Sequence, residues 1–167
     1  MRIIFCLLCM MLWHAVCCAV PVFPSGSSVI DQTKTLTKED VSYLNNLCGI
    51  LEERTGKRLK IAAVKCMSDN GDVGQIVCTD KDVYADAIRA AGNYDIVLLL
   101  SMKEMVVTIH APKDVLLNRK EIISNNTLPQ LETEDIPSAV KNTASEIVNV
   151  LMEEDTLRRN KNYYGWW

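Results

Sequence analysis

Apolar positions recur along this chain with two different periods, and the changes between them predict its elements. Between Val41 and Leu51 the apolar residues have helical spacing. Thr37 stands where a helix N-cap would accept a backbone hydrogen bond, and Asp40 completes a capping-box variant. Gly56 follows the last apolar position and is typical of a helix end. We therefore predict a helix that begins after Thr37 and ends at Gly56.

Two short apolar runs flank a second helical pattern. Residues 59–67 have the continuous apolar character of a strand covered on both faces, and residues 95–101 repeat it. Helical spacing between them starts at Thr79 or Asp80 and ends at Gly92. A strand, a helix and a strand within about 40 residues form a βαβ unit, so the two strands should be parallel with a right-handed crossover.

The remainder of the chain predicts a hairpin and further helices. The two residues after 101 leave room only for a tight turn, and alternation over 104–110 predicts an antiparallel partner strand. Pro112 is expected to open a third helix, and Asp135 with Pro137 a long last helix. The expected fold is α/β: a three-layer sandwich with a small mixed sheet, made of a βαβ unit plus an antiparallel hairpin, and helices on both faces.

The N-terminus has the layout of a secretory signal peptide. A positive end, an apolar run from Ile3 to Val16 and the small residues up to Ala19 predict that residues 1–19 are removed. An N-terminal membrane anchor is the weaker alternative, because the run is shorter than the roughly 20 residues a span needs. The expected location is secreted and extracellular. The expected divisions are a signal peptide over 1–19, an extended segment over 20–34, a folded domain over 35–155 and an aromatic tail over 156–167.

Charge and hydropathy narrow the classes of partner. The formal net charge is −3, and loss of Arg2 with the leader makes it one unit more negative. Without a basic field, no nucleic acid is expected as a partner. The stretch from Tyr94 to His110 is strongly apolar, but Lys103 and Glu104 interrupt it, so no transmembrane helix is expected in the mature chain.

Residues with catalytic chemistry are few. His110 is the sole histidine after the leader, and no Gly-rich phosphate loop or G-x-S-x-G turn is present. Acidic residues surround the loop after the first predicted strand, at the edge where parallel sheets bind ligands. Because calcium takes several oxygen ligands, they are weak candidates for a metal site, although their spacing matches no EF-hand loop. These candidates are Asp69, Asp72, Asp80 and Asp82.

Cysteine and sequon positions fit an exported protein. The export route is oxidising, so a disulfide is expected among Cys48, Cys66 and Cys78. A Cys66–Cys78 bridge would close a loop of about a dozen residues, while Cys48 lies on the apolar helix face as a buried thiol. Pairing of Cys48 with either of the others stays open. Asn125 begins a glycosylation sequon in a predicted loop.

The end of the chain is rich in aromatic residues. Tyr163, Tyr164, Trp166 and Trp167 are candidates for partner binding, with a disordered end or an interfacial membrane anchor as alternatives.

Taken in order, these patterns resemble the TPM domain. The stretches that carry the resemblance are PSGSSVID, the Leu-Thr cap with its helix, EERTGK, DIVLLLS and MVVTI. The resemblance runs from about Val29 to Glu154, and secretion and cysteines bring the chain nearest to the nematode modulators of the levamisole receptor. It implies an α/β sandwich and, for that branch, a non-enzymatic extracellular auxiliary of acetylcholine-gated channels. We therefore expect no cofactor and a protein that binds or modulates a cell-surface or extracellular protein partner, with an acetylcholine receptor complex as a candidate.

The resemblance also implies an alternative function. The thylakoid-lumen branch implies acid-phosphatase-like activity with calcium, and Asp31 and Asp95, which match acidic family positions, are then the catalytic candidates. The family tends to place Asp-Arg in the hairpin turn and Gly after the third strand. This chain has Lys103-Glu104 and Ala111-Pro112 there, which disfavours that alternative, a metal-dependent hydrolase. A carrier of small hydrophobic ligands is a third alternative that no residue favours.

Overall fold

Four strands form one mixed sheet in the order in which they occur along the chain. The computed structural model describes residues 21–67, 81–115 and 117–164, so the expected leader lies outside the described residues. The first three strands are parallel and the fourth is antiparallel to the third, which confirms the predicted mixed sheet. The strands are β1 (Val29–Asp31), β2 (Leu59–Val64), β3 (Ile96–Ser101) and β4 (Val106–His110).

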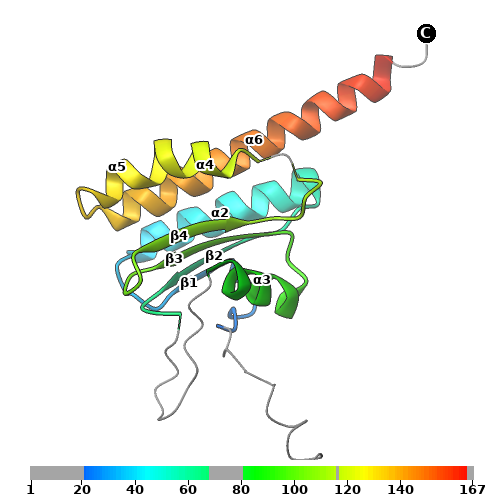
Figure 1. Ribbon diagram of the computed structural model, residues 1–167. Helices are drawn as coiled ribbons and strands as arrows, with labels where there is room; N and C mark the ends of the chain where they lie inside the picture. Colours follow the sequence, from blue (N-terminus) through cyan, green and yellow to red (C-terminus); the bar gives the residue numbers. More distant parts are fainter. Residues whose placement is uncertain (1–20, 68–80, 116, 165–167) are drawn as a thin grey trace, which may run out of the picture.

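Helices cover both faces of this sheet (Figure 1). Helix α2 (Lys38–Thr55) connects β1 to β2 and lies with the last helix, α6 (Ile136–Tyr164), on one face. Helix α3 (Lys81–Gly92) connects β2 to β3 on the other face. A short segment packs against α6 and consists of α4 (Arg119–Ile122), a π-helical turn (Ile123–Thr127) and α5 (Leu128–Leu131). The predicted three-layer α/β architecture is therefore confirmed.

Each face of the sheet has its own core because successive residues of a strand point to opposite sides. Ile61 and Leu98 pack toward α2 and α6, where Ile147 of α6 is fully buried. Leu99, one residue later, packs toward Ile88 of α3. Since both faces are covered, the central strands are apolar except for Lys60 in β2 and Ser101 at the end of β3, as their nearly continuous pattern indicated.

The ends of α2 follow the sequence prediction. The Thr37 hydroxyl accepts the Asp40 N–H at 3.1 Å, and the Asp40 carboxylate accepts the Thr37 N–H at 3.0 Å, which completes the capping box. Gly56 ends the helix with a φ of 72°, a left-handed conformation that glycine adopts without strain. Lys141 of α6 donates to Asp40 at 2.7 Å. This hydrogen bond, aided by the Thr37 backbone, holds the pKa of Asp40 below its ordinary value.

The expected helix at Pro112 does not form there. The chain makes turns after Ala111, and helical structure begins only at Arg119. Val115 sits in this turn and is buried in the core, and the Arg119 guanidinium donates to the Ala111 carbonyl at 2.6 Å. Burial of one apolar side chain therefore outweighs the helix-opening preference of the proline.

Other boundaries also differ from the predictions. The hairpin turn occupies residues 102–105 rather than two residues, with Met105 at a φ of 52°. Strand β1 forms inside the segment 20–34 that we expected only to be extended, and it pairs in parallel with β2. Helix α6 continues past residue 155 to Tyr164. Among the described residues, every helix is too short or too polar to cross a membrane.

Candidate functional site

Asp31 lies where β1 ends, at the carboxyl edge of the parallel strands, and holds the turn that leads to α2. One carboxylate oxygen accepts the N–H groups of Thr33 and Lys34, both at 2.9 Å, and the other accepts the Leu36 N–H at 2.8 Å. The Thr33 hydroxyl donates to the same carboxylate. This arrangement supports Lys34 in a left-handed conformation, with a φ of 59°. Asp31 is therefore engaged as a backbone anchor.

Glu104 in the hairpin turn has a comparable role at the same edge. Its carboxylate accepts hydrogen bonds from the Ser101 hydroxyl and from the Met67 N–H, the latter at 3.3 Å. Burial alone would raise the pKa of Glu104, but these hydrogen bonds lower it below its usual value. Glu104 thus ties the hairpin turn to the end of β2 as an ionised carboxylate.

Asp95 lies at the opposite edge of the sheet, before the start of β3. It accepts the Arg58 N–H at 2.7 Å and forms an ion pair with the Arg58 side chain at 3.8 Å. In the strand register, Asp31 aligns through Ala63 with Leu100, which follows Asp95 by five residues. At about 3.3 Å per residue, the two carboxyl positions are about 16 Å apart along the strands. The structure does not bring Asp31 and Asp95 together in one site.

Of the four acidic residues predicted as candidate metal ligands, the structure describes one. Asp69, Asp72 and Asp80 lie outside the described residues, and Asp82 accepts the Thr108 hydroxyl at 3.0 Å. Within the described ranges, no three acidic, histidine or cysteine side chains converge as a metal site would require. His110, the remaining histidine, lies 3.0 Å from the Asp86 carboxylate. A calcium site in the loop after β2 stays a prediction.

The cysteines occupy two environments. Cys48 is a buried free thiol in the core between α2 and the sheet, as its place on the apolar helix face indicated. Burial raises the pKa of the Cys48 thiol to about 12. Cys66 is buried after the end of β2, and Cys78 lies outside the described residues, so the Cys66–Cys78 bridge stays a prediction.

Alkylation of the leader-free protein tests this pairing. In denaturant without reductant, we expect a thiol reagent to modify Cys48 alone, because Cys66 and Cys78 are joined. In the native protein we expect Cys48 to stay unmodified, because its thiol is buried and its pKa is raised to about 12, so that almost no reactive thiolate is present at mildly alkaline pH. Peptide mass analysis measures both results. A disulfide-linked peptide that contains Cys48 would contradict the assignment.

The predicted glycosylation residue and two of the predicted partner-binding residues belong to helical segments. Asn125 is exposed, but it belongs to the π-helical turn rather than to a loop, and Thr127 of its sequon is buried with its hydroxyl 2.6 Å from that of Thr143. Tyr163 and Tyr164 are the last residues of α6. Trp166 and Trp167 lie outside the described residues.

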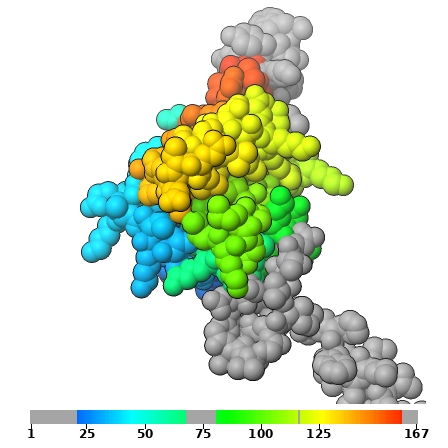
Figure 2. All heavy atoms as spheres, turned by 60° about the vertical axis from the view of Figure 1, so that its left-hand side comes forward, coloured from blue at the N-terminus to red at the C-terminus, as the bar shows by residue number. Residues whose placement is uncertain are grey.

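The last part of α6 leaves the body of the domain. Over residues 136–160 of this helix, Leu151 is the last buried residue, and residues 156–160 are exposed. Figure 1 shows α6 extending beyond the other helices, and Figure 2 shows its end protruding above the surface formed by α4 and α5. We call residues 156–164 the α6 arm. At about 1.5 Å per residue, the α6 arm is about 13 Å long.

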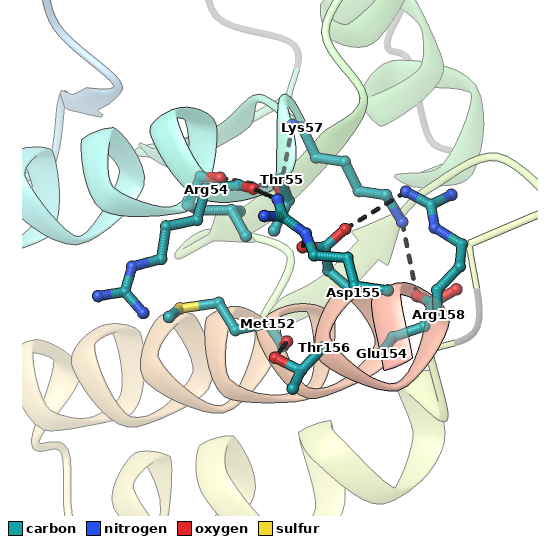
Figure 3. A network of polar contacts seen from close by, with 10 residues as sticks. Arg54, Thr55, Lys57, Met152, Glu154, Asp155, Thr156 and Arg158 are labelled. Atoms are coloured by element: carbon teal, nitrogen blue, oxygen red, sulfur yellow. Dashed lines mark hydrogen bonds and ion pairs between the residues drawn. The ribbon is translucent and has the colours of Figure 1, made fainter. Parts of the chain in front are cut away.

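A polar network holds the base of the α6 arm against the end of α2 (Figure 3). The Arg159 guanidinium donates to the Arg54 carbonyl at 2.5 Å and pairs with Asp155 at 2.6 Å. Lys57 pairs with Glu154 at 3.5 Å. Because α2 ends here, the Arg159 guanidinium also lies at the negative end of the helix dipole. A hollow of about 430 Å³ lies between the two helices at this point. Sequence patterns did not predict this contact, because no local spacing relates the two helix ends.

Comparison with known proteins identifies the fold and the family. The model of the TPM domain matches residues 29–150. No curated protein matches the chain at a significant level. Two bacterial domains solved by NMR are similar in structure. The N-terminal domain of a protein from P. gingivalis has a TM-score of 0.68 at 10% identity, over 79% of this chain and 86% of that one. The N-terminal domain of the cg2496 protein from Corynebacterium glutamicum has a TM-score of 0.57 at 14% identity, over 78% and 83%. At these identities the two structures show the fold alone.

Proposed function

Because this chain belongs to the TPM domain family, we propose that it is a secreted, non-enzymatic protein that binds or modulates a cell-surface partner. An acetylcholine receptor complex is the first candidate, since the chain resembles the nematode modulators of the levamisole receptor. The leader-like residues 1–19 support secretion. The engagement of Asp31 and Asp95 in separate backbone contacts supports a binding role over a hydrolytic one.

The α6 arm is the observation that carries this proposal. Its residues 156–160 are exposed, Arg159 and Asp155 hold its base, and it leads to Tyr163 and Tyr164, with Trp166 and Trp167 following in the sequence. Tyr and Trp are the side chains that most often dominate the energy of protein interfaces. A helix that is fixed to the domain at its base and continues to Tyr164 reduces the entropy lost when a partner binds this segment.

Removal of the aromatic tail is expected to weaken binding strongly. We would compare the mature chain with a chain that ends at Asn160, using immobilised ectodomain of an acetylcholine-gated channel and surface plasmon resonance. The truncation should raise the dissociation constant at least about tenfold, because interface aromatic residues often contribute 2 kcal/mol or more each. Thermal unfolding should remain unchanged, since the truncation begins ten residues after Leu151, the last buried residue over 136–160 of α6.

A matched control separates the aromatic side chains from the length of the helix. Lys161→Ala and Asn162→Ala change the same stretch but keep its aromatic residues, and we expect nearly unchanged affinity. Equal binding by the full and the truncated chains would remove the α6 arm from the proposal. No binding to any such ectodomain would remove the proposed partner.

The hydrolase alternative requires a different set of results. A metal-dependent acid phosphatase should release phosphate from a generic ester in a calcium- or magnesium-dependent manner and should bind the ion with measurable heat. Its candidates Asp31 and Asp95 lie at opposite edges of the sheet, so a single site cannot use both. Phosphate release that an Asp95→Asn or Asp31→Asn variant abolishes would replace the binding proposal.

A further inference from the structure

The outer edge of β4 opens into a hollow between two helical segments. Within the described part of the chain, β4 is the last strand of the sheet and pairs only with β3. A hollow of about 380 Å³ runs along residues 107–110 of this strand. The beginning of α3 forms one wall, through Lys81 and Asp82, and the α4 segment forms the other, through Arg119, Lys120 and Ile123.

The backbone of β4 can form another ladder in this hollow. In an antiparallel pair, alternate residues turn both their N–H and C=O groups toward the partner strand, and the residues between them turn these groups away. Such an outer edge can pair with an added strand, which is how several domains recognise extended peptides. The four consecutive strand residues that line the hollow extend over about 13 Å at the usual rise of a strand.

The walls of the hollow are predominantly cationic. Lys81 and Lys120 are exposed, one on each wall. Arg119 is held in place by its hydrogen bond to the Ala111 carbonyl. The carboxylate of Asp82 accepts the Thr108 hydroxyl. The hollow therefore has three cationic side chains and one acidic one, although the chain as a whole has a formal net charge of −3.

The Asp86 carboxylate beside the hollow does not reverse this balance. It pairs with Arg89 at 2.9 Å and lies 3.0 Å from His110. Its charge is thus compensated by Arg89 on the same helix, while Lys81 and Lys120 are exposed.

We propose that this hollow binds an extended, acidic segment of a partner protein, which pairs with β4 as an additional strand. Backbone hydrogen bonds from β4 give the segment its extended conformation and its alignment. Lys81 on one side and Lys120 on the other select acidic side chains, which in an extended strand alternate between the two faces. This surface is separate from the α6 arm, so the proposal does not depend on the partner suggested for that arm.

Fluorescence anisotropy with a labelled synthetic peptide tests the proposal. The probe is a peptide of about six residues, a usual strand length, with two adjacent Glu at its centre and Val elsewhere, so that one Glu faces each wall. We expect saturable binding to the full mature chain that weakens as salt is added. The charge-reversing double variant Lys81→Glu, Lys120→Glu should bind about tenfold more weakly, because two exposed attractions become repulsions.

Three controls distinguish strand pairing from general charge attraction. The variant Lys34→Glu, Lys38→Glu has the same net charge as the test variant. It changes exposed residues before and at the start of α2 that do not line the hollow, so it should bind like the original protein. A peptide in which Lys replaces Glu should not bind. The acidic peptide methylated at alternate backbone nitrogens should bind at least about tenfold more weakly, because it loses the donors of the ladder.

Three results would overturn the proposal. Binding that is unaffected by backbone methylation would mean attraction by charge without strand pairing. Equal loss in both lysine double variants would mean that the binding lies elsewhere. Absence of binding up to about 1 mM peptide would exclude the hollow as a peptide site. The receptor-binding experiment with the truncated α6 arm is read separately, so failure of either proposal leaves the other measurable.

Discussion

Replacement of Ile147 by Ala is expected to lower the free energy of unfolding by about 2–5 kcal/mol, the usual range for such a change in a core. Ile147 is fully buried where α6 packs against α2 and the sheet, so the smaller side chain leaves a cavity. Urea unfolding followed by circular dichroism measures the change. The effect should also reach function, because the buried part of α6 determines where the α6 arm points.

Leu157→Ala is the matched control on the same helix. The Leu157 side chain is 56% exposed on the α6 arm, and its truncation should change the free energy of unfolding by less than about 0.5 kcal/mol. If both substitutions had the same small effect, α6 would not be packed on the domain as described, and the basis for a rigid arm would be lost.

Asp31→Ala is expected to cost about 2 kcal/mol of folding free energy, since hydrogen bonds to a charged acceptor contribute roughly 1.5–3 kcal/mol. The substitution leaves the N–H groups of Thr33, Lys34 and Leu36 without their acceptor, and Lys34 without support for its left-handed backbone. Chemical denaturation measures the loss, and hydrogen exchange should show faster exchange of these amides.

Asp114→Ala provides the comparison for Asp31, because Asp114 is an exposed acid in another turn. We expect it to leave stability within about 0.5 kcal/mol of the original. If Asp31→Ala were equally neutral, the carboxylate would be available for ligand chemistry, and the hydrolase alternative would gain support.

Local sequence signals predicted the parts of the fold that depend on local physics. The capping box of Thr37 and Asp40 and the glycine at position 56 define the ends of α2 through contacts within a few residues. The apolar runs that became β2 and β3 are buried on both faces, which their composition already indicated. The resemblance to the TPM domain rested on the order of these elements, and the match of the family model to residues 29–150 confirms the family.

What sequence patterns missed depends on distant partners. β1 is three residues long and is stable only because it pairs with β2, so no period could reveal it. Val115 is buried against core residues that are distant in the sequence, and this burial displaces the start of the helix expected at Pro112. Asp31 and Asp95 were both visible as acids, but only the strand register shows that they lie at opposite edges. The hollow at β4 likewise joins Lys81 and Lys120 from separate segments.

The sequential order of the sheet has a consequence for synthesis. Each strand pairs with the one made just before it, so the sheet can assemble from β1 to β4 as the chain emerges. The core beside α2 cannot close in this way, because α6 is the last helix and contributes Ile147 and Leu151 to it. One face of a finished sheet therefore stays uncovered until the final helix is delivered. During that interval the nascent protein should depend on a chaperone, and an interrupted chain that lacks α6 should aggregate rather than fold.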